Sequence, residues 1–138
     1  MARYQITRHD SHVAALATAA TLADALASLA EGMFSLIVDT MRVQARESIS
    51  IEIDARNMDE LVVDWLNELL FRYNTDGFLP REINITVDEA HHSLSAFCVG
   101  ERFDRDRHSL RSEVRLATNR DFMIHHNGEW AIQVTLDV

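Results

Sequence analysis

The sequence predicts an α+β fold, in which a mostly antiparallel β-sheet has two α-helices packed on one face. Two stretches repeat apolar residues at helical spacing, whereas the stretches around them alternate apolar and polar residues as strands do. Short connections between neighbouring strands favour antiparallel pairing, because a parallel crossover needs roughly a dozen residues. The chain has one proline and no linker-like segment, so we expect a single domain over residues 1–138.

The first part of the chain is predicted to form two strands and a helix. Residues 4–8 and 12–18 are the strands. Thr21 followed by Asp24 marks the start of the helix, because a threonine oxygen can accept a hydrogen bond from a free first-turn N–H. The helix runs to about Val38 and has one apolar stripe. The stripe consists of Leu22, Leu26, Leu29, Met33 and Leu36.

A third strand and a second helix follow. Residues 43–55 include a clear alternation of apolar and polar side chains, which is typical of a strand. Asn57 and Glu60 mark the start of the second helix, and Gly77 suits the left-handed conformation in which helices often end. Trp65 lies on the apolar face of this helix, so we expect it in the core.

The rest of the chain is predicted to form strands. Alternating patterns cover residues 83–87, 94–98, 114–118, 122–126 and 129–138. Asn127-Gly128, between the last two patterns, predicts a hairpin with a type I′ turn. In the last strand the apolar side chains share one face, and Asp137 lies on the other face. An apolar face that holds the tail in a sheet also fixes the position of the Asp137 carboxylate.

The composition limits the partners and the compartment. The formal net charge of −9 disfavours tight binding to nucleic acid, and suits a basic protein partner or a cation. Cys98 is the only cysteine and lies in a strand-like segment, so we expect a buried thiol in a reducing compartment. Residues 21–40 carry three acids and are too polar for a membrane span, and residues 1–6 lack a signal-peptide pattern. A cytoplasmic protein without membrane contact is expected.

Three residues are candidate metal ligands. His12 begins an early strand, Asp39 closes the first helix and Asp137 ends the last strand. An acid at the negative end of a helix dipole is unfavourable unless a cation lies nearby. Two carboxylates and an imidazole suit a divalent ion, and the imidazole favours a transition metal. Spacing alone does not bring the three together. His108, by contrast, lies in a charged run that we expect to be an exposed turn.

Two segments of the chain are more specific than general-purpose motifs. They are WLNELLF at residues 65–71 and GERFDRDRH at residues 100–108. Shorter segments accompany them in a fixed order: HDSHV at 9–13, TL at 21–22, GMF at 32–34, IVD at 37–39 and LDV at 136–138. Together these segments resemble the archease family over essentially the whole chain.

The resemblance implies a function and a metal site. Archeases are small acidic α+β proteins that act as non-enzymatic cofactors of the RtcB-type RNA-splicing ligase in tRNA splicing and RNA repair. They stimulate guanylylation of the ligase, which is the covalent loading of GMP onto an active-site histidine. The family also has a divalent-metal site, with calcium as the metal, formed by three acids. Asp39 and Asp137 match two of these acids. The third falls on His12, which favours a transition metal such as zinc, although Asp10 is close enough to substitute after a local shift.

The chain also departs from the family in the segment RLATNR at residues 115–120. Asn119 and Arg120 replace an aromatic residue and an imidazole, which affects ligase activation if this segment faces the ligase.

Two other functions are compatible with the residues. One is an independent metal-dependent hydrolase that uses His12, Asp39 and Asp137. The other is a chaperone-like assembly factor.

Overall fold

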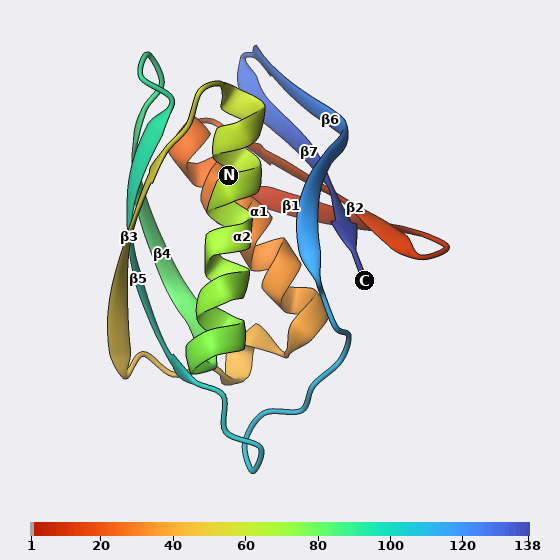
Figure 1. Ribbon diagram of the computed structural model, residues 1–138, viewed down its shortest axis with the longest axis vertical. Coiled ribbons are helices and arrows are strands. Elements are labelled where there is room, and N and C mark those ends of the chain that lie inside the picture. The colour runs from red at the N-terminus through yellow and green to blue at the C-terminus, as the bar shows by residue number, and fades with distance from the viewer. Residues whose placement is uncertain (1) are drawn as a thin grey trace.

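The computed structural model describes residues 2–138 and confirms the α+β class (Figure 1). This part of the chain forms seven strands: β1 (Arg3–His9), β2 (His12–Ala19), β3 (Glu47–Asp54), β4 (Phe78–Asp88), β5 (Ser93–Arg102), β6 (Leu116–Asn127) and β7 (Glu129–Asp137). The two α-helices are α1 (Leu22–Ile37) and α2 (Met58–Asp76), and a short 3-10 helix, η1 (Thr40–Arg42), follows α1.

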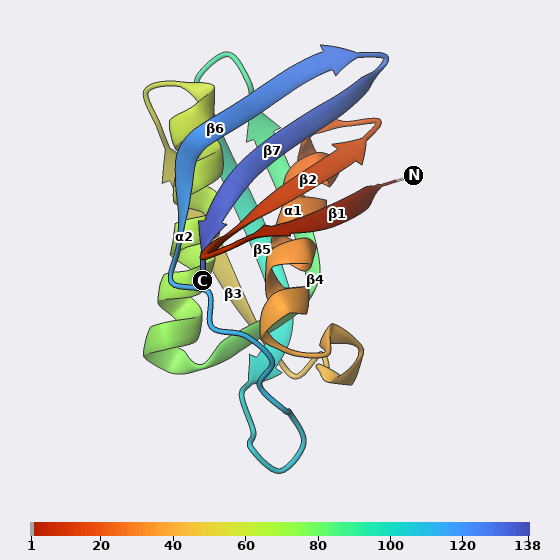
Figure 2. The same cartoon turned by 90° about the vertical axis from the view of Figure 1, so that its right-hand side faces the viewer.

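The strands form two sheets, where the sequence indicated one. The orders are β1-β2-β7-β6 and β3-β5-β4, and the strand pairings of the described residues are all antiparallel. The helices lie between the two sheets, as Figures 1 and 2 show, so each sheet has one face toward them. Helix α1 contacts β2 and β4, whereas α2 contacts β6 and β3. The helices therefore separate two β layers and do not simply cover one.

Helix α1 is buried on more sides than its leucine stripe predicts. Of its 16 residues, 11 are buried, including Ala25, Ala30 and Gly32. Small side chains allow other elements to approach the helix closely, and a Cβ on Gly32 would come within 3.0 Å of the Tyr4 ring on β1. The leucine stripe predicted that one face of α1 is packed. The small residues explain how other elements also pack on its remaining faces.

The core contains the large residues that the sequence placed there. Trp65 is fully buried, and its indole N–H donates a hydrogen bond to the backbone oxygen of Leu26 at 3.0 Å, which joins the two helices. Cys98 is also fully buried, between Ile49 and Ile83 on the inner face of the three-stranded sheet. Burial raises the pKa of its thiol to about 11. These contacts confirm the expected roles of Trp65 and Cys98.

The predicted helix ends are confirmed. The Thr21 hydroxyl accepts a hydrogen bond from the backbone N–H of Asp24 at 3.1 Å, and α1 begins at the next residue, Leu22. Asn57 caps α2 in the same way, with its Oδ1 accepting from the N–H of Glu60 at 3.0 Å. Gly77 ends α2 with φ of 74°, a conformation that costs glycine little.

Three local predictions differ from the structure. Strand β3 begins at Glu47, because Val43 caps η1 and is buried outside the sheet. The two predicted strands 114–118 and 122–126 fall on one strand, β6, which begins at Leu116 and is interrupted by a bulge. The final hairpin is present, but among its turn residues Gly128 alone has a positive φ, so the turn is not of type I′.

No helix within residues 2–138 combines the length and apolar character that a membrane crossing requires.

Candidate functional site

His12 and Asp137 are direct neighbours across two strands. His12 is the first residue of β2 and pairs in register with Asp137, the last residue of β7. Directly opposed residues share one face of an antiparallel sheet, so both side chains project to the same side. His9 is the register partner of His12 on β1, and the centroids of the two rings are 6.0 Å apart. The structure thus places two of the three predicted ligands side by side.

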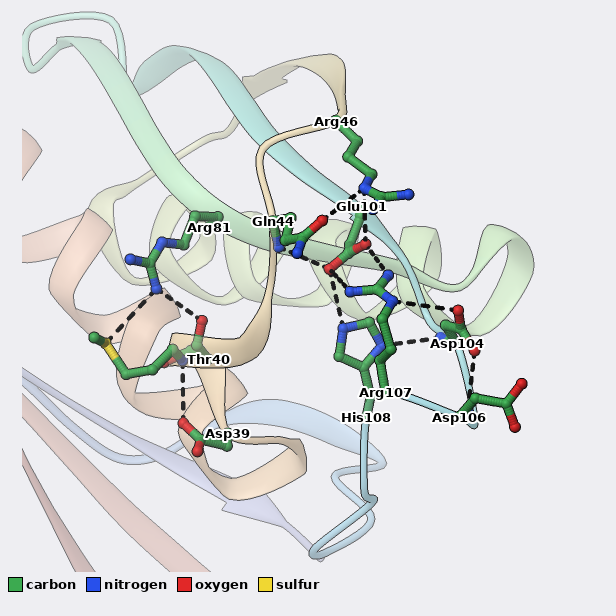
Figure 3. A network of polar contacts seen from close by, with 11 residues as sticks. Asp39, Thr40, Gln44, Arg46, Arg81, Glu101, Asp104, Asp106, Arg107 and His108 are labelled. Atoms are coloured by element: carbon green, nitrogen blue, oxygen red, sulfur yellow. Dashed lines mark hydrogen bonds and ion pairs between the residues drawn. The ribbon is translucent and has the colours of Figure 1, made fainter.

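Asp39, the third predicted ligand, has a local structural role. It caps the start of η1, where its Oδ1 accepts a hydrogen bond from the backbone N–H of Met41 at 3.1 Å (Figure 3). We expected an acid at this position to need a nearby cation. The cap gives another reason, because the carboxylate satisfies a free N–H at the start of a new helical turn.

The loop of residues 103–115, which we call the 103–115 segment, joins β5 to β6 and contacts the elements next to Asp39 and Asp137. The backbone N–H of Arg111 donates to the oxygen of Ile37 at the end of α1, and that of Arg115 donates to the oxygen of Asp137, both at 2.8 Å. Figure 2 shows the C-terminus beside the turn between β1 and β2, above the loop that the 103–115 segment forms.

The three predicted ligands do not fit a ready-made metal site. Within residues 2–138, no three His, Cys, Asp or Glu side chains are grouped closely enough to hold a metal ion. The adjacent pair of His12 and Asp137 offers fewer ligands than the roughly four of zinc sites or the roughly six to eight of calcium sites. We therefore derive no step through a metal, and the metal site stays a prediction.

The most highly connected polar cluster surrounds Glu101, near the end of β5 (Figure 3). Glu101 is 2% exposed. Its Oε2 accepts hydrogen bonds from the backbone N–H of Gln44 at 2.7 Å and from Nη1 of Arg107 at 3.1 Å, and a second Arg107 nitrogen donates to Oε1. His108 completes the set, with Nε2 at 3.0 Å from Oε2. Four groups from two segments thus meet on one carboxylate.

His108 is buried, so the prediction of an exposed turn at this residue was wrong. Its Nδ1 accepts a hydrogen bond from the backbone N–H of Asp104 at 2.9 Å. A ring nitrogen that accepts carries no proton, so Nε2 is the protonated nitrogen and donates to Glu101. The imidazole therefore links the start of the 103–115 segment to the end of β5. The sequence showed a run of charges, but it did not show that these charges pair with one another.

The contacts of Glu101 hold its pKa well below the usual range, at about 2. Hydrogen bonds from Arg107 are the largest cause, and those from Gln44 and His108 add to it, whereas burial acts in the opposite direction. Such a carboxylate is ionised at neutral pH and is a weak base, because a general base works best with a pKa near the working pH. The cluster is therefore suited to holding the 103–115 segment in place.

Asn67, in the other family-specific segment, holds strand β6 against α2. Its side-chain N–H donates to the backbone oxygen of Ala117 at 3.0 Å, and its Oδ1 accepts from the N–H of Ala117 at 2.8 Å. A side-chain amide that satisfies both backbone groups of one residue acts like one more rung of a β-ladder. Asn67 therefore ties the helix to the four-stranded sheet.

Gly100, the first residue of GERFDRDRH, is fixed by close packing of the backbone. A Cβ at this position would lie 1.9 Å from the oxygen of Leu79 on β4, which leaves no space for any side chain. Gly100, Glu101, His108 and Asn67 all have structural roles. The two most specific segments therefore stabilise the fold. Sequence reasoning missed these roles, although the close spacing of Glu101, Arg107 and His108 is a signal that could have indicated the cluster.

The departures at Asn119 and Arg120 lie in the bulge of β6. Residues 119–122 face Val134 alone in β7, because Thr118 pairs with Thr135 and Met123 with Gln133. The hydroxyl of Thr135 donates to the backbone oxygen of Arg120 at 2.7 Å, which fixes the bulge on the sheet. The altered residues are therefore in a defined, protruding part of an edge strand.

Comparison with known proteins agrees with this fold. The model of the Archease protein family (MTH1598/TM1083) matches residues 4–138. Similar proteins include the protein archease of Methanopyrus kandleri, 30% identical with 94% of this chain and 95% of the relative covered, and that of Thermococcus gammatolerans, 25% identical over the full length of both. The solution structure of Methanobacterium thermoautotrophicum protein 1598 matches with a TM-score of 0.84 and 26% identity over 98% of each chain. The chain therefore belongs to the archease family.

Proposed function

We propose that this protein is a non-enzymatic activator of an RtcB-type RNA ligase and that it promotes guanylylation of the ligase during tRNA splicing and RNA repair. The family match over residues 4–138 carries the proposal. The formal net charge of −9 supports it, because an acidic protein is attracted to the basic surface of an RNA-binding enzyme. In this proposal the ligase performs the chemistry and the present chain supplies a protein contact.

The roles of the family-specific residues support a modulator over a catalyst. Asn67 and Glu101 both use their polar atoms to fix backbone segments. A catalytic residue instead needs a polar group directed toward a substrate, with a pKa suited to proton transfer. These segments thus preserve a particular surface, and a preformed surface lowers the entropy cost of binding a partner.

Guanylylation of a purified ligase tests the proposal directly. The ligase, GTP labelled in the α-phosphate and a divalent metal are incubated with and without this protein, and the ligase–GMP adduct is measured with time. We expect faster adduct formation and more ligation turnovers per ligase. A ligase variant without its GMP-accepting histidine controls for label bound elsewhere. An unchanged adduct rate over a range of protein concentrations would contradict the proposal.

The two alternative functions require different properties of the protein: a metal site for the hydrolase and many partner proteins for the chaperone-like role. The hydrolase requires a metal at His12, Asp39 and Asp137, of which the structure pairs only His12 with Asp137. The chaperone-like role requires many clients, so partners captured from native cells separate it from the ligase proposal. One predominant ligase supports activation, whereas many unrelated proteins support a chaperone-like role.

A further inference from the structure

A cleft of about 470 Å³ lies between strand β3 and helix α2. Its lining includes Glu52 and Asp54 from β3 and Asp64, Glu68 and Phe71 from α2. It is separate from the end of the molecule that carries the 103–115 segment, whose residues do not contribute to its lining. The cleft therefore combines a strand, a helix and four acidic residues, and it includes neither the Glu101 cluster nor His12, Asp39 and Asp137, although Asn67 also lines it.

Strand β3 is at the edge of its sheet. In the order β3-β5-β4 its one strand neighbour is β5, and Figure 1 shows β3 at the border of the sheet, beside α2. An edge strand presents backbone N–H and C=O groups that another strand can pair with. Peptide-binding domains use this arrangement when an extended peptide adds to an exposed sheet edge.

The charges of the cleft favour a basic occupant. Within residues 2–138, no ion pair within 4.0 Å joins Glu52, Asp54 or Asp64 to a basic group, although Glu68 pairs with Arg72 at 2.9 Å. Burial and the nearby Glu60 raise the pKa of Asp64, and Arg56 lowers it less. A basic side chain entering the cleft would therefore meet carboxylates that have no basic partner of their own among the described residues.

Phe71 gives the cleft an apolar contact at its edge. Its side chain comes from the exposed side of α2, and the residue is 58% exposed. Large aromatic residues contribute strongly to protein interfaces when a partner covers them, because they bury much area at a small entropy cost. In an added strand, the side chains between the basic ones project to the face of α2, where an apolar side chain can cover such a ring.

We propose that the cleft between β3 and α2 binds an extended segment of a partner protein that carries arginine or lysine at alternate positions. The segment pairs with the free edge of β3 as an added strand. Its basic side chains lie on the same face as Glu52 and Asp54 and contact these two carboxylates, and an apolar side chain between them faces α2 and packs on Phe71. The argument depends on the edge strand, the lining and the charges, and it does not depend on the ligase proposal.

An alternating peptide tests this inference without any ligase. The probe is a capped eight-residue peptide of alternating Arg and Val, titrated into the full-length protein and followed by NMR. We expect shifts of the amide signals of Ser50, Glu52 and Asp64, slower hydrogen exchange on β3 and weaker binding at high salt. The double variant E52Q/D54N should weaken binding about tenfold, because two exposed ion pairs are lost.

Two controls separate strand addition from general attraction between charges. The variant E82Q/E89Q removes two exposed carboxylates, one on β4 and one in the turn between β4 and β5, and should leave the affinity within about twofold. The same peptide with alternate N-methylated amides keeps its charge but cannot pair along its length. Three outcomes would each overturn the inference. They are equal weakening by both variants, unchanged binding of the methylated peptide, and self-association of the protein through β3 without peptide.

Discussion

At the scale of single residues, the adjacent His12 and Asp137 explain why the tail of the chain holds a carboxylate in a defined place. Register fixes both residues, since one ends β7 and the other begins β2. The sequence predicted this for Asp137 from the alternation of the last strand alone. It could not predict the neighbour of Asp137, because strand order depends on contacts between residues more than a hundred positions apart.

Asp137→Asn tests the predicted metal site. The change is nearly isosteric, so the unfolding free energy should change by less than about 0.5 kcal/mol. If a transition metal binds, calorimetry with zinc should give heat for the unaltered protein and about tenfold weaker binding for the variant. His12→Ala should weaken binding at least as much. Zinc binding of equal strength in all three proteins would place the ion elsewhere.

Trp65→Ala tests the core of α2. Trp65 is fully buried and also donates a hydrogen bond to Leu26, so the variant should lose about 3–5 kcal/mol of unfolding free energy. Trp130 is the matched control, because it is only partly buried, and its ring stacks on His126 with centroids 4.3 Å apart. Urea unfolding should show a clearly smaller loss for Trp130→Ala. Equal losses would contradict the assignment of Trp65 to the centre of the core.

At the scale of elements, helix caps were predictable and strand pairing was not. The side chains of Thr21 and Asn57 act within three residues, so a local pattern is enough to identify them. The division of the strands into two sheets depends instead on which faces of α1 and α2 are covered. An α-helix with small residues on several sides can be covered by more than one layer, but the pattern does not say by which strands.

Asn67→Ala tests the attachment of α2 to β6. The variant leaves the N–H and C=O of Ala117 without their side-chain partner, so the unfolding free energy should fall by about 1–3 kcal/mol. Hydrogen exchange at the Ala117 amide should become faster by a larger factor than exchange in the three-stranded sheet. Asn84→Ala, at an exposed position of β4, is the control and should change stability little. Uniform acceleration in both sheets would show that the contact has no local role.

At the scale of the whole molecule, the Glu101 cluster makes the free energy of unfolding depend on pH. The pKa of Glu101 is about 2 in the folded protein, below the ordinary value of 4.5. A carboxylate with a lowered pKa stabilises the fold above the ordinary pKa, and this contribution is lost as the pH falls toward the folded value. We expect the loss between about pH 5 and pH 2, with a size of about 2–3 kcal/mol.

Glu101→Gln isolates this contribution. The raised pKa values of Glu31 and Asp64 act in the opposite direction and are the same in both proteins, so the difference between them reports on Glu101. Urea unfolding should show the variant less stable at pH 7 and nearly equal to the unaltered protein near pH 2. A difference that stays constant from pH 7 to pH 2 would contradict the low pKa of Glu101.

The fold was therefore predicted in class and in most of its element order, except that two predicted strands fall on the single strand β6, and the arrangement into two sheets was not predicted. The α+β class and the two helices follow from periodicity, which reflects local burial. His12, Asp39 and Asp137 were proposed as a site from residue type and position alone, whereas the cap made by Asp39 and the burial of His108 depend on hydrogen bonds that a one-dimensional pattern does not show.

Because Cys98 is buried, the reactivity of its thiol reports when the three-stranded sheet opens. As the only thiol in the chain, and one whose pKa of about 11 keeps it protonated, it is protected from alkylating reagents while the three-stranded sheet is closed. A pulse of iodoacetamide followed by mass spectrometry would therefore count the molecules in which β5 has separated from its neighbours. The rate of alkylation at this sulfur therefore measures how often the sheet opens locally, without any engineered label.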